Sequence, residues 1–133
     1  VTASGGGHGL VCLFSFELDG IRFAHLGDLG RPLTAEQIAA LGEVDVLFVP
    51  VGGAYTIDAA EAIGVIEQLD TVSVVFPMHY LVDGITPWTD LDPLATFVDL
   101  LPNEWAVRVP EAEIVTLDEL PETIEVWTPT YAR

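Results

Sequence analysis

Two continuous apolar runs constrain the fold of this chain more than any other feature. They are DVLFVPV, residues 45–51, and TVSVVFP, residues 71–77. Runs of this kind are typical of strands that lie in a parallel sheet and are covered on both faces. Between them, Asp58 and Glu61 have the spacing of a helix-capping box, and apolar residues recur after it at helical intervals. Residues 45–77 therefore predict one βαβ unit.

The residues before this unit predict an antiparallel hairpin. Apolar side chains alternate in LVCLFSFEL, residues 10–18, which predicts a single strand with an apolar face. Asp19-Gly20 is a two-residue turn favoured in hairpins, and IRFAHL, residues 21–26, is the expected partner strand. Since this first pair must be antiparallel, the sheet is mixed, which argues against a flavodoxin-like domain with its parallel sheet.

The rest of the chain adds short elements to this frame. Thr34 and Gln37 form a second capping box, which predicts a helix over residues 35–41. The remaining expected elements are a helix opened by Asp92-Pro93 and short strands near residues 113–117 and 124–128. The chain has 133 residues and half of them are hydrophobic, which suits one domain with a core of its own. We therefore predict a single α/β domain over residues 1–133.

Charge excludes several classes of partner. The sequence has no lysine, and its four arginines face 21 acidic residues, so the formal net charge is −17. Such a chain repels nucleic-acid backbones and anionic membrane surfaces. No apolar run reaches the ~18 residues that a membrane span needs. Cys12 is the single cysteine, which rules out an internal disulfide and fits a reducing compartment. We expect a cytoplasmic protein that binds neither nucleic acid nor membrane.

Ionisable residues follow two of the predicted strands at the points where these strands end. Asp28 comes after Gly27, where the backbone can turn its carboxylate outward, and His79 follows Pro77 and Met78. Because the carboxyl ends of neighbouring strands meet at one edge of a sheet, both side chains are expected in the same crevice. An imidazole and a carboxylate together suit a divalent transition metal, and zinc above all. His8, in SGGGHGL, is a candidate third ligand.

Each candidate has a structural alternative. The Asp28 carboxylate could accept a hydrogen bond from the backbone two residues on, as in an Asx turn. His8 could be a solvent-exposed histidine in a glycine tract. His25, on the strand face of Ile21 and Phe23, is expected to be a packed strand histidine rather than a ligand.

Other kinds of chemistry find little support in the sequence. SGGGHG lacks the patterns of a phosphate-binding loop, and no G-x-S-x-G nucleophile motif occurs. Cys12 lies within a predicted strand, where a thiol is buried and inert. Asp58 is interpreted as a helix cap, and Tyr55 either lines a pocket or packs as a loop aromatic. Covalent catalysis is therefore not expected.

Three segments together resemble a known family. HLGDLG, PVGGAYTIDAAEA and PMHY occur in this order from residue 25 to residue 80. They are similar to the second half of metallo-β-lactamase-fold hydrolases, in particular the branch of ascorbate-6-phosphate-lactonase-like enzymes. The resemblance covers about residues 10–128 and implies half of an αββα sandwich with a metal site at the edge of its sheets.

The resemblance also implies roles for the candidate residues. Asp28 would be the catalytic carboxylate that bridges two metal ions, His79 would bind the second ion, and His8 lies near the place of another histidine ligand. The family takes most remaining ligands from an H-x-H-x-D-H motif in its first half, and residues 1–133 contain no such motif. The chain is thus expected to be the C-terminal half only.

The implied function is metal-dependent hydrolysis of a small-molecule ester, lactone or phosphodiester. One or two zinc ions would serve as the cofactor, with manganese and iron as the remaining alternatives. Strand faces that the other half would cover should be exposed, so the chain is expected to form a homo-oligomer or to dock with an N-terminal half. The alternative function is a metal-free binding module with the same half-fold.

Overall fold

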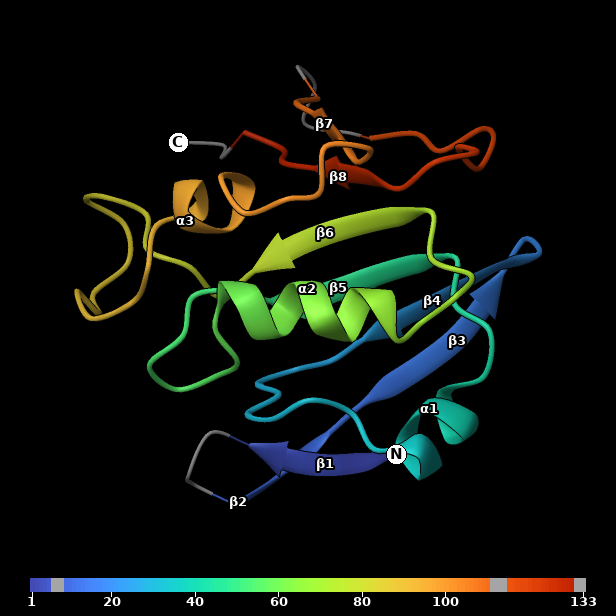
Figure 1. Ribbon diagram of the computed structural model, residues 1–133, viewed down its shortest axis with the longest axis horizontal. Helices are drawn as coiled ribbons and strands as arrows, with labels where there is room; N and C mark the ends of the chain where they lie inside the picture. The colour runs from blue at the N-terminus through green and yellow to red at the C-terminus, as the bar shows by residue number, and fades with distance from the viewer. Residues whose placement is uncertain (6–8, 111–114, 131–133) are drawn as a thin grey trace.

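A six-stranded mixed sheet forms the centre of the computed structural model, which describes residues 1–5, 9–110 and 115–130 (Figure 1). Its strand order is β3-β4-β5-β6-β8-β7, and β1 and β2 form a separate antiparallel pair. The strands are β1 Thr2–Gly5, β2 Gly9–Cys12, β3 Phe14–Leu18, β4 Ile21–His25, β5 Val46–Pro50, β6 Val74–Met78, β7 Ala106–Arg108 and β8 Glu125–Trp127. The helices are α1 Ala35–Leu41, α2 Ala59–Glu67 and α3 Leu94–Val98.

The predicted α/β class and the mixed sheet are confirmed. β3 and β4 form the antiparallel hairpin, whereas β4, β5, β6, β8 and β7 pair in parallel along the sheet. β5, α2 and β6 are the predicted βαβ unit, and Figure 1 shows α2 lying across the strands. Both capping boxes form, with Thr34 capping α1 and Asp58 capping α2.

The prediction of one strand over residues 10–18 is wrong, because the pairing changes at Leu13. Leu13 is buried, and its backbone N–H donates to the Val1 carbonyl oxygen at 2.6 Å. Residues before it therefore pair with β1, while residues after it pair with β4. The alternation of apolar residues predicts extended backbone on both sides of Leu13. It does not show that β2 pairs with β1 while β3 pairs with β4.

The C-terminal part also differs from expectation. β8 matches the strand predicted near 124–128, but its second partner is β7 rather than a strand near 113–117. Residues 113 and 114 lie outside the described part of the chain, and residues 115–117 form no strand. Val115 and Leu117 instead pack against a cluster around Trp127, which explains their apolar character. α3, the helix expected after Asp92-Pro93, buries Phe97 in the main core.

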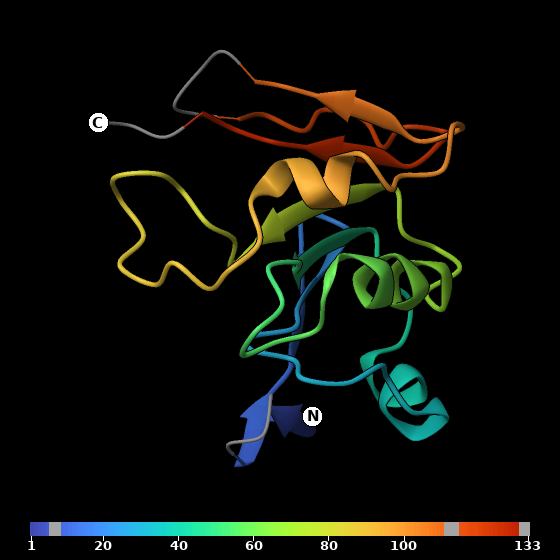
Figure 2. The same cartoon turned by 60° about the vertical axis from the view of Figure 1, so that its left-hand side comes forward.

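Strand register divides the side chains of the sheet between two faces. On one face, residues of β4, β5, β6 and β8 are fully buried in the main core, together with α2; these strand residues are Ala24, Leu47, Val49, Val75 and Val126. The opposite face, here called the open face, carries Phe14, Phe16, Leu18, Ile21, Phe23, His25, Phe48 and Phe76, together with the buried side chains of Val46, Val74 and Trp127. In the view of Figure 2, α1 and α2 (teal and green) lie to one side of β3, β4 and β5.

An aromatic row crosses the open face. His25 stacks on Phe48, Phe48 stacks on Phe76, and Phe76 meets Trp127 edge to face. At the end of the row, the guanidinium of Arg108 on β7 lies 4.4 Å from the centre of the Trp127 ring. A groove of about 420 Å³ runs between the hairpin side of this face and residues 115–117. The open face thus remains uncovered at β3, where Phe14, Phe16 and Leu18 are exposed, whereas Ile21 and Phe23 of β4 are partly buried.

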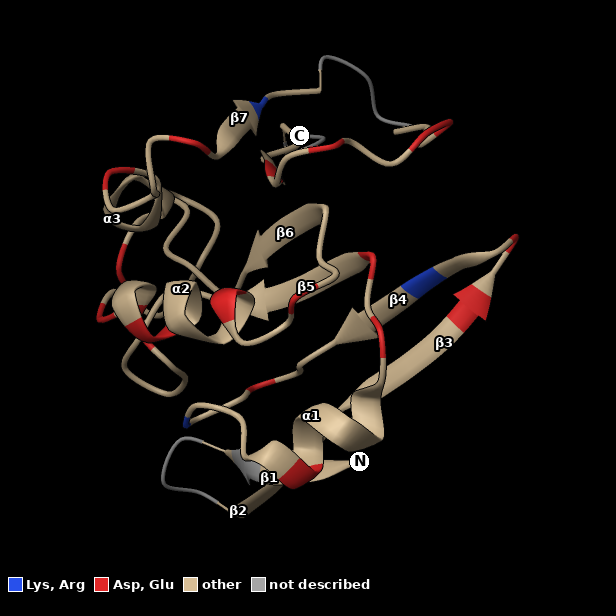
Figure 3. Ribbon diagram, turned by 45° about the vertical axis from the view of Figure 1, so that its right-hand side comes forward, with Lys and Arg blue, Asp and Glu red and all other residues tan. Residues whose placement is uncertain are grey.

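Charge is distributed very differently from apolar surface. Figure 3 shows acidic residues spread over the loops and helices, with basic residues confined to a few positions.

Within the described residues, no helix is both long and apolar enough to cross a membrane.

Candidate metal site at the carboxyl ends of the strands

Three loops meet beyond the carboxyl ends of β4, β5 and β6. The Leu26 N–H donates to the Phe48 carbonyl oxygen at 3.0 Å, which joins the exits of β4 and β5. The Val51 N–H donates to the Met78 carbonyl oxygen at 3.0 Å, which joins the exits of β5 and β6. The parallel order of these strands therefore brings residues far apart in the sequence to one edge.

The backbones of Gly52 and His79 lie in close contact. His79 has a φ of 56°, a left-handed conformation that non-glycine residues adopt rarely. A Cβ atom at Gly52 would lie only 2.0 Å from the His79 carbonyl oxygen, so only glycine fits there. Strained backbone of this kind persists where the surrounding structure enforces it, and it collects at functional sites. This close contact, here called the Gly52 lock, constrains the position of the His79 backbone and therefore of its Cβ atom.

Asp28 and His79 face each other across this edge. The His79 Nε2 atom lies 3.9 Å from the Asp28 Oδ1 atom. That distance is too long for a hydrogen bond, but two donors that each lie ~2.1 Å from one zinc ion can be up to about 4 Å apart. The Asp28 side chain is 70% exposed and that of His79 is 26% exposed, so the pair is open to solvent on the carboxylate side. The geometry suits a cation shared by the two residues.

The other ring nitrogen of His79 supports the same orientation. The Nδ1 atom is buried and has no hydrogen-bond partner within the described residues. A histidine that binds a metal through one nitrogen ordinarily donates its other ring N–H to a carboxylate, a backbone carbonyl or water, and burial of Nδ1 leaves Nε2 as the nitrogen that reaches solvent. Nε2 is therefore the atom available to a ligand.

Asp28 does not form the Asx turn that was its structural alternative. Within the part of the chain that the structure describes, its carboxylate accepts no hydrogen bond from the backbone. The turn is instead bonded by His25, whose Nδ1 atom accepts a hydrogen bond from the Gly27 N–H at 3.0 Å. The His25 ring lies on the predicted strand face and stacks on Phe48, but the residue is exposed, so the expected packing applies to one ring face only.

The third candidate ligand cannot be placed. His8 lies outside the described residues. Among the residues described, no group of three or more histidine, cysteine, aspartate or glutamate side chains could hold a metal ion. The structure thus brings together Asp28 and His79 alone, and their roles as ligands stay a prediction.

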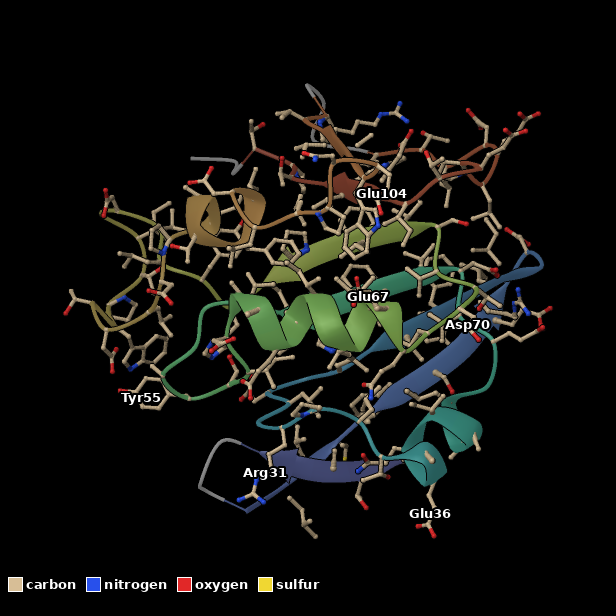
Figure 4. All side chains as sticks on the ribbon, in the orientation of Figure 1. Arg31, Glu36, Tyr55, Glu67, Asp70 and Glu104 are labelled. Carbon is tan, nitrogen blue, oxygen red and sulfur yellow. The ribbon has the colours of Figure 1, made fainter. Side chains whose placement is uncertain are left out.

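Two loops beside the pair are tied together by Tyr55 and Asp90. Figure 4 shows Tyr55 at the edge of the molecule, in the loop that follows β5. A hydrogen bond to the Asp90 carboxylate, and then the charge of that group, raise the pKa of the Tyr55 hydroxyl. Tyr55 is partly exposed rather than packed. The sequence carries no spacing signal for this contact, because its partners lie in different loops.

A pocket of about 790 Å³ is lined by Tyr80, the residue that follows His79 in the chain, whereas neither His79 nor Asp28 lines it. It lies between the loop after β6, α3 and the segment after β8. Its lining is mostly apolar and includes Val82, Asp83, Ile85, Leu94, Thr128 and Pro129. The residue next to His79 in the chain thus lines a concave surface large enough for a small molecule.

Comparison with known proteins identifies the family. Residues 4–79 match the model of a "Beta-lactamase superfamily domain", and this range ends on His79 and includes Asp28. The chain belongs to the metallo-β-lactamase superfamily. A crystal structure from Thermotoga maritima, of a superfamily member whose proposed activity is that of a zinc-dependent hydrolase, shares 36% sequence identity and superimposes with a TM-score of 0.79. The match covers 97% of this chain and 62% of that one.

Curated relatives in the superfamily are described as UPF0173 metal-dependent hydrolases. The protein from Natranaerobius thermophilus is 33% identical over 82 residues, which is 62% of this chain and 36% of the relative. The protein from Archaeoglobus fulgidus is 35% identical over 85 residues, which is 64% of this chain and 35% of the relative. The matched region thus spans about a third of these relatives. The superfamily is established, whereas the lactonase-like branch stays a prediction.

Proposed function

We propose that this chain contributes Asp28 and His79 to the metal site of a hydrolase, with zinc as the preferred ion. The observation that carries the proposal is the 3.9 Å separation of Nε2 and Oδ1 across the ends of β4 and β6. The description of the relatives as metal-dependent hydrolases supports the same reaction class. Manganese and iron remain alternatives for the ion.

The two residues have different capacities as ligands. The Asp28 carboxylate has two oxygens and is exposed, so it can bridge two ions, whereas His79 offers one nitrogen to one ion. Zinc, when bound, supplies Lewis acidity that activates water and polarises the bond to be cleaved. Asp28 would orient the ions against the substrate, and the Gly52 lock would hold His79 in place. Neither residue needs to transfer a group itself.

The proposed substrate is a small ester, lactone or phosphodiester that binds in the pocket beside Tyr80. That pocket is mostly apolar and is lined by Tyr80, the chain neighbour of His79. A catalytic zinc ion needs about three protein donors, so further ligands must complete the site. We propose that they come from the region around His8, from a second copy of the chain, or from an N-terminal half that packs on the open face.

Zinc titration of the 133-residue chain by calorimetry tests this proposal. Asp28→Ala and His79→Ala should each weaken zinc binding by more than about tenfold, because each removes one donor. Asp70→Ala is the matched control, since Asp70 is an exposed carboxylate at the opposite end of the sheet (Figure 4). Zinc binding that is undiminished in Asp28→Ala and His79→Ala would contradict the proposal, and a starting chain that binds no zinc would favour the metal-free binding module.

A further inference from the structure

His25 holds the turn that carries Asp28. Its Nδ1 atom lies 3.0 Å from the Gly27 backbone nitrogen, which can only donate. Nδ1 must therefore be unprotonated, so a neutral His25 ring carries its proton on Nε2. The ring also stacks on Phe48, with 5.7 Å between the ring centres and an angle of 25° between the ring planes. The imidazole is thus fixed from two sides in spite of its exposure.

Gly27 needs this support because of its conformation. Its φ is 53°, and a Cβ atom there would lie 2.9 Å from the Val11 Cγ2 atom. Glycine permits the left-handed turn but gives the backbone more freedom than any other residue would. The hydrogen bond from the Gly27 N–H to His25 removes part of that freedom directly before Asp28.

The flanking residues are anchored by the backbone. The Leu26 N–H donates to Phe48, and the Leu29 carbonyl oxygen accepts from the Ile57 N–H at 2.8 Å. Both leucines are fully buried. Asp28 therefore sits on a short bridge between two fixed points, and His25 supplies the side-chain contact within that bridge.

We propose that His25 is a positioning residue, which orients the 25–28 turn so that the Asp28 carboxylate faces His79. The inference rests on the proposed function, since positioning matters only if the pair shares an ion. A metal–ligand distance tolerates errors of only a few tenths of an ångström, so an unsupported turn should bind metal less tightly. His25 itself need not contact metal or substrate.

Two variants separate the hydrogen bond from the stacking. His25→Phe keeps an aromatic ring on Phe48 but has no acceptor for the Gly27 N–H. His25→Asn loses the ring but restores an acceptor, because asparagine side chains bond the backbone N–H two residues on. In His25→Phe, amide exchange at Gly27 measured by NMR should accelerate, and zinc affinity should fall about tenfold or more. In His25→Asn, both values should stay within about threefold of those of the starting protein.

The ¹⁵N NMR chemical shifts of the His25 imidazole give a further test, because they report which ring nitrogen carries the proton. Packing on Phe48 alone would not fix the tautomer of the ring. In the starting protein, at a pH where the ring is neutral, His25 should show the tautomer protonated on Nε2. Protonation on Nδ1, or unchanged Gly27 exchange and zinc affinity in His25→Phe, would overturn the inference. Asp28→Ala, measured alongside, distinguishes the two levels: if it leaves zinc binding unchanged the proposed function fails, and if it abolishes binding while His25→Phe does not, only the inference fails.

Discussion

Gly52 is the single residue that most tightly limits the shape of the candidate site. Gly52→Ala would place a methyl group 2.0 Å from the His79 carbonyl oxygen, so the exits of β5 and β6 would have to separate. We expect a loss of about 2–4 kcal/mol in the free energy of unfolding, measured with urea. Gly64→Ala is the matched control, because nothing lies within 4 Å of a Cβ atom at that helical position. It should stabilise the protein by about 0.5–1 kcal/mol, and an equal loss in both variants would contradict the lock.

The meeting of Asp28 and His79 could be predicted from the sequence, whereas their supports could not. Both residues follow strong strand patterns, and the rule that parallel strands end at a common edge places them together. Gly52 gave no such signal, since a glycine in a loop has many uses until its neighbour in space is known. The part played by His25 depends on the hydrogen bond that its ring makes to Gly27, which no sequence spacing reveals.

A buried carboxylate joins β4 to the start of β5 at the end of the sheet away from the site. Asp45 accepts hydrogen bonds from the Arg22 backbone N–H and from its Nε, both at 2.8 Å, and forms an ion pair with the same guanidinium. The hydrogen bonds from Arg22, opposed by burial, lower the pKa of Asp45 below its ordinary value of 3.8. Arg22 also contacts Glu43. Asp45 is therefore ionised in the folded protein at any pH near neutrality.

This arrangement predicts a defined pH dependence. Because the pKa of Asp45 is lower in the folded than in the unfolded chain, its ionised form stabilises the fold fully above about pH 5. That contribution is lost as the pH falls below 3.8 toward the lowered pKa. Asp45→Asn should be less stable than the starting protein at pH 7, and the difference in urea-unfolding free energy should shrink on acidification. A difference that does not change between pH 7 and pH 3 would contradict this account.

At the level of helices and strands, the sequence predicts helix starts better than it predicts which strands pair. The capping boxes at Thr34 and Asp58 specify where α1 and α2 begin, because each cap involves residues only three positions apart. The break at Leu13 depends instead on β1, whose strand pairing has no local signature. For the same reason, the sequence does not predict the pairing of β7 with β8, and it predicts a strand near residues 113–117, where residues 115–117 form none.

The open face dominates the behaviour expected of the whole molecule. Phe14, Phe16 and Leu18 are exposed side by side on β3, at the edge of the sheet. Contiguous apolar surface of this kind marks a binding face, and an edge strand invites further pairing. We therefore expect the isolated chain to bind an apolar dye and to self-associate in gel filtration, in spite of its net charge of −17.

A matched pair of variants locates this association. Leu18 and Leu100 are similarly exposed, at 59% and 52%, but Leu18 belongs to the open face and Leu100 follows α3. Leu18→Ser should reduce dye fluorescence and shift gel filtration toward the monomer, whereas Leu100→Ser should change neither. A monomer without dye binding in the starting protein would contradict the expected exposure of this face.

The origin of Asp28 and His79 in separate strand exits has a thermodynamic consequence. In the unfolded chain the two groups are far apart, so an ion that needs both can bind only after β4, β5 and β6 have assembled. Such an ion acts as a ligand of the native state, and it stabilises that state by RT ln(1 + [ion]/Kd). The melting temperature of the chain then becomes a direct measure of ion occupancy.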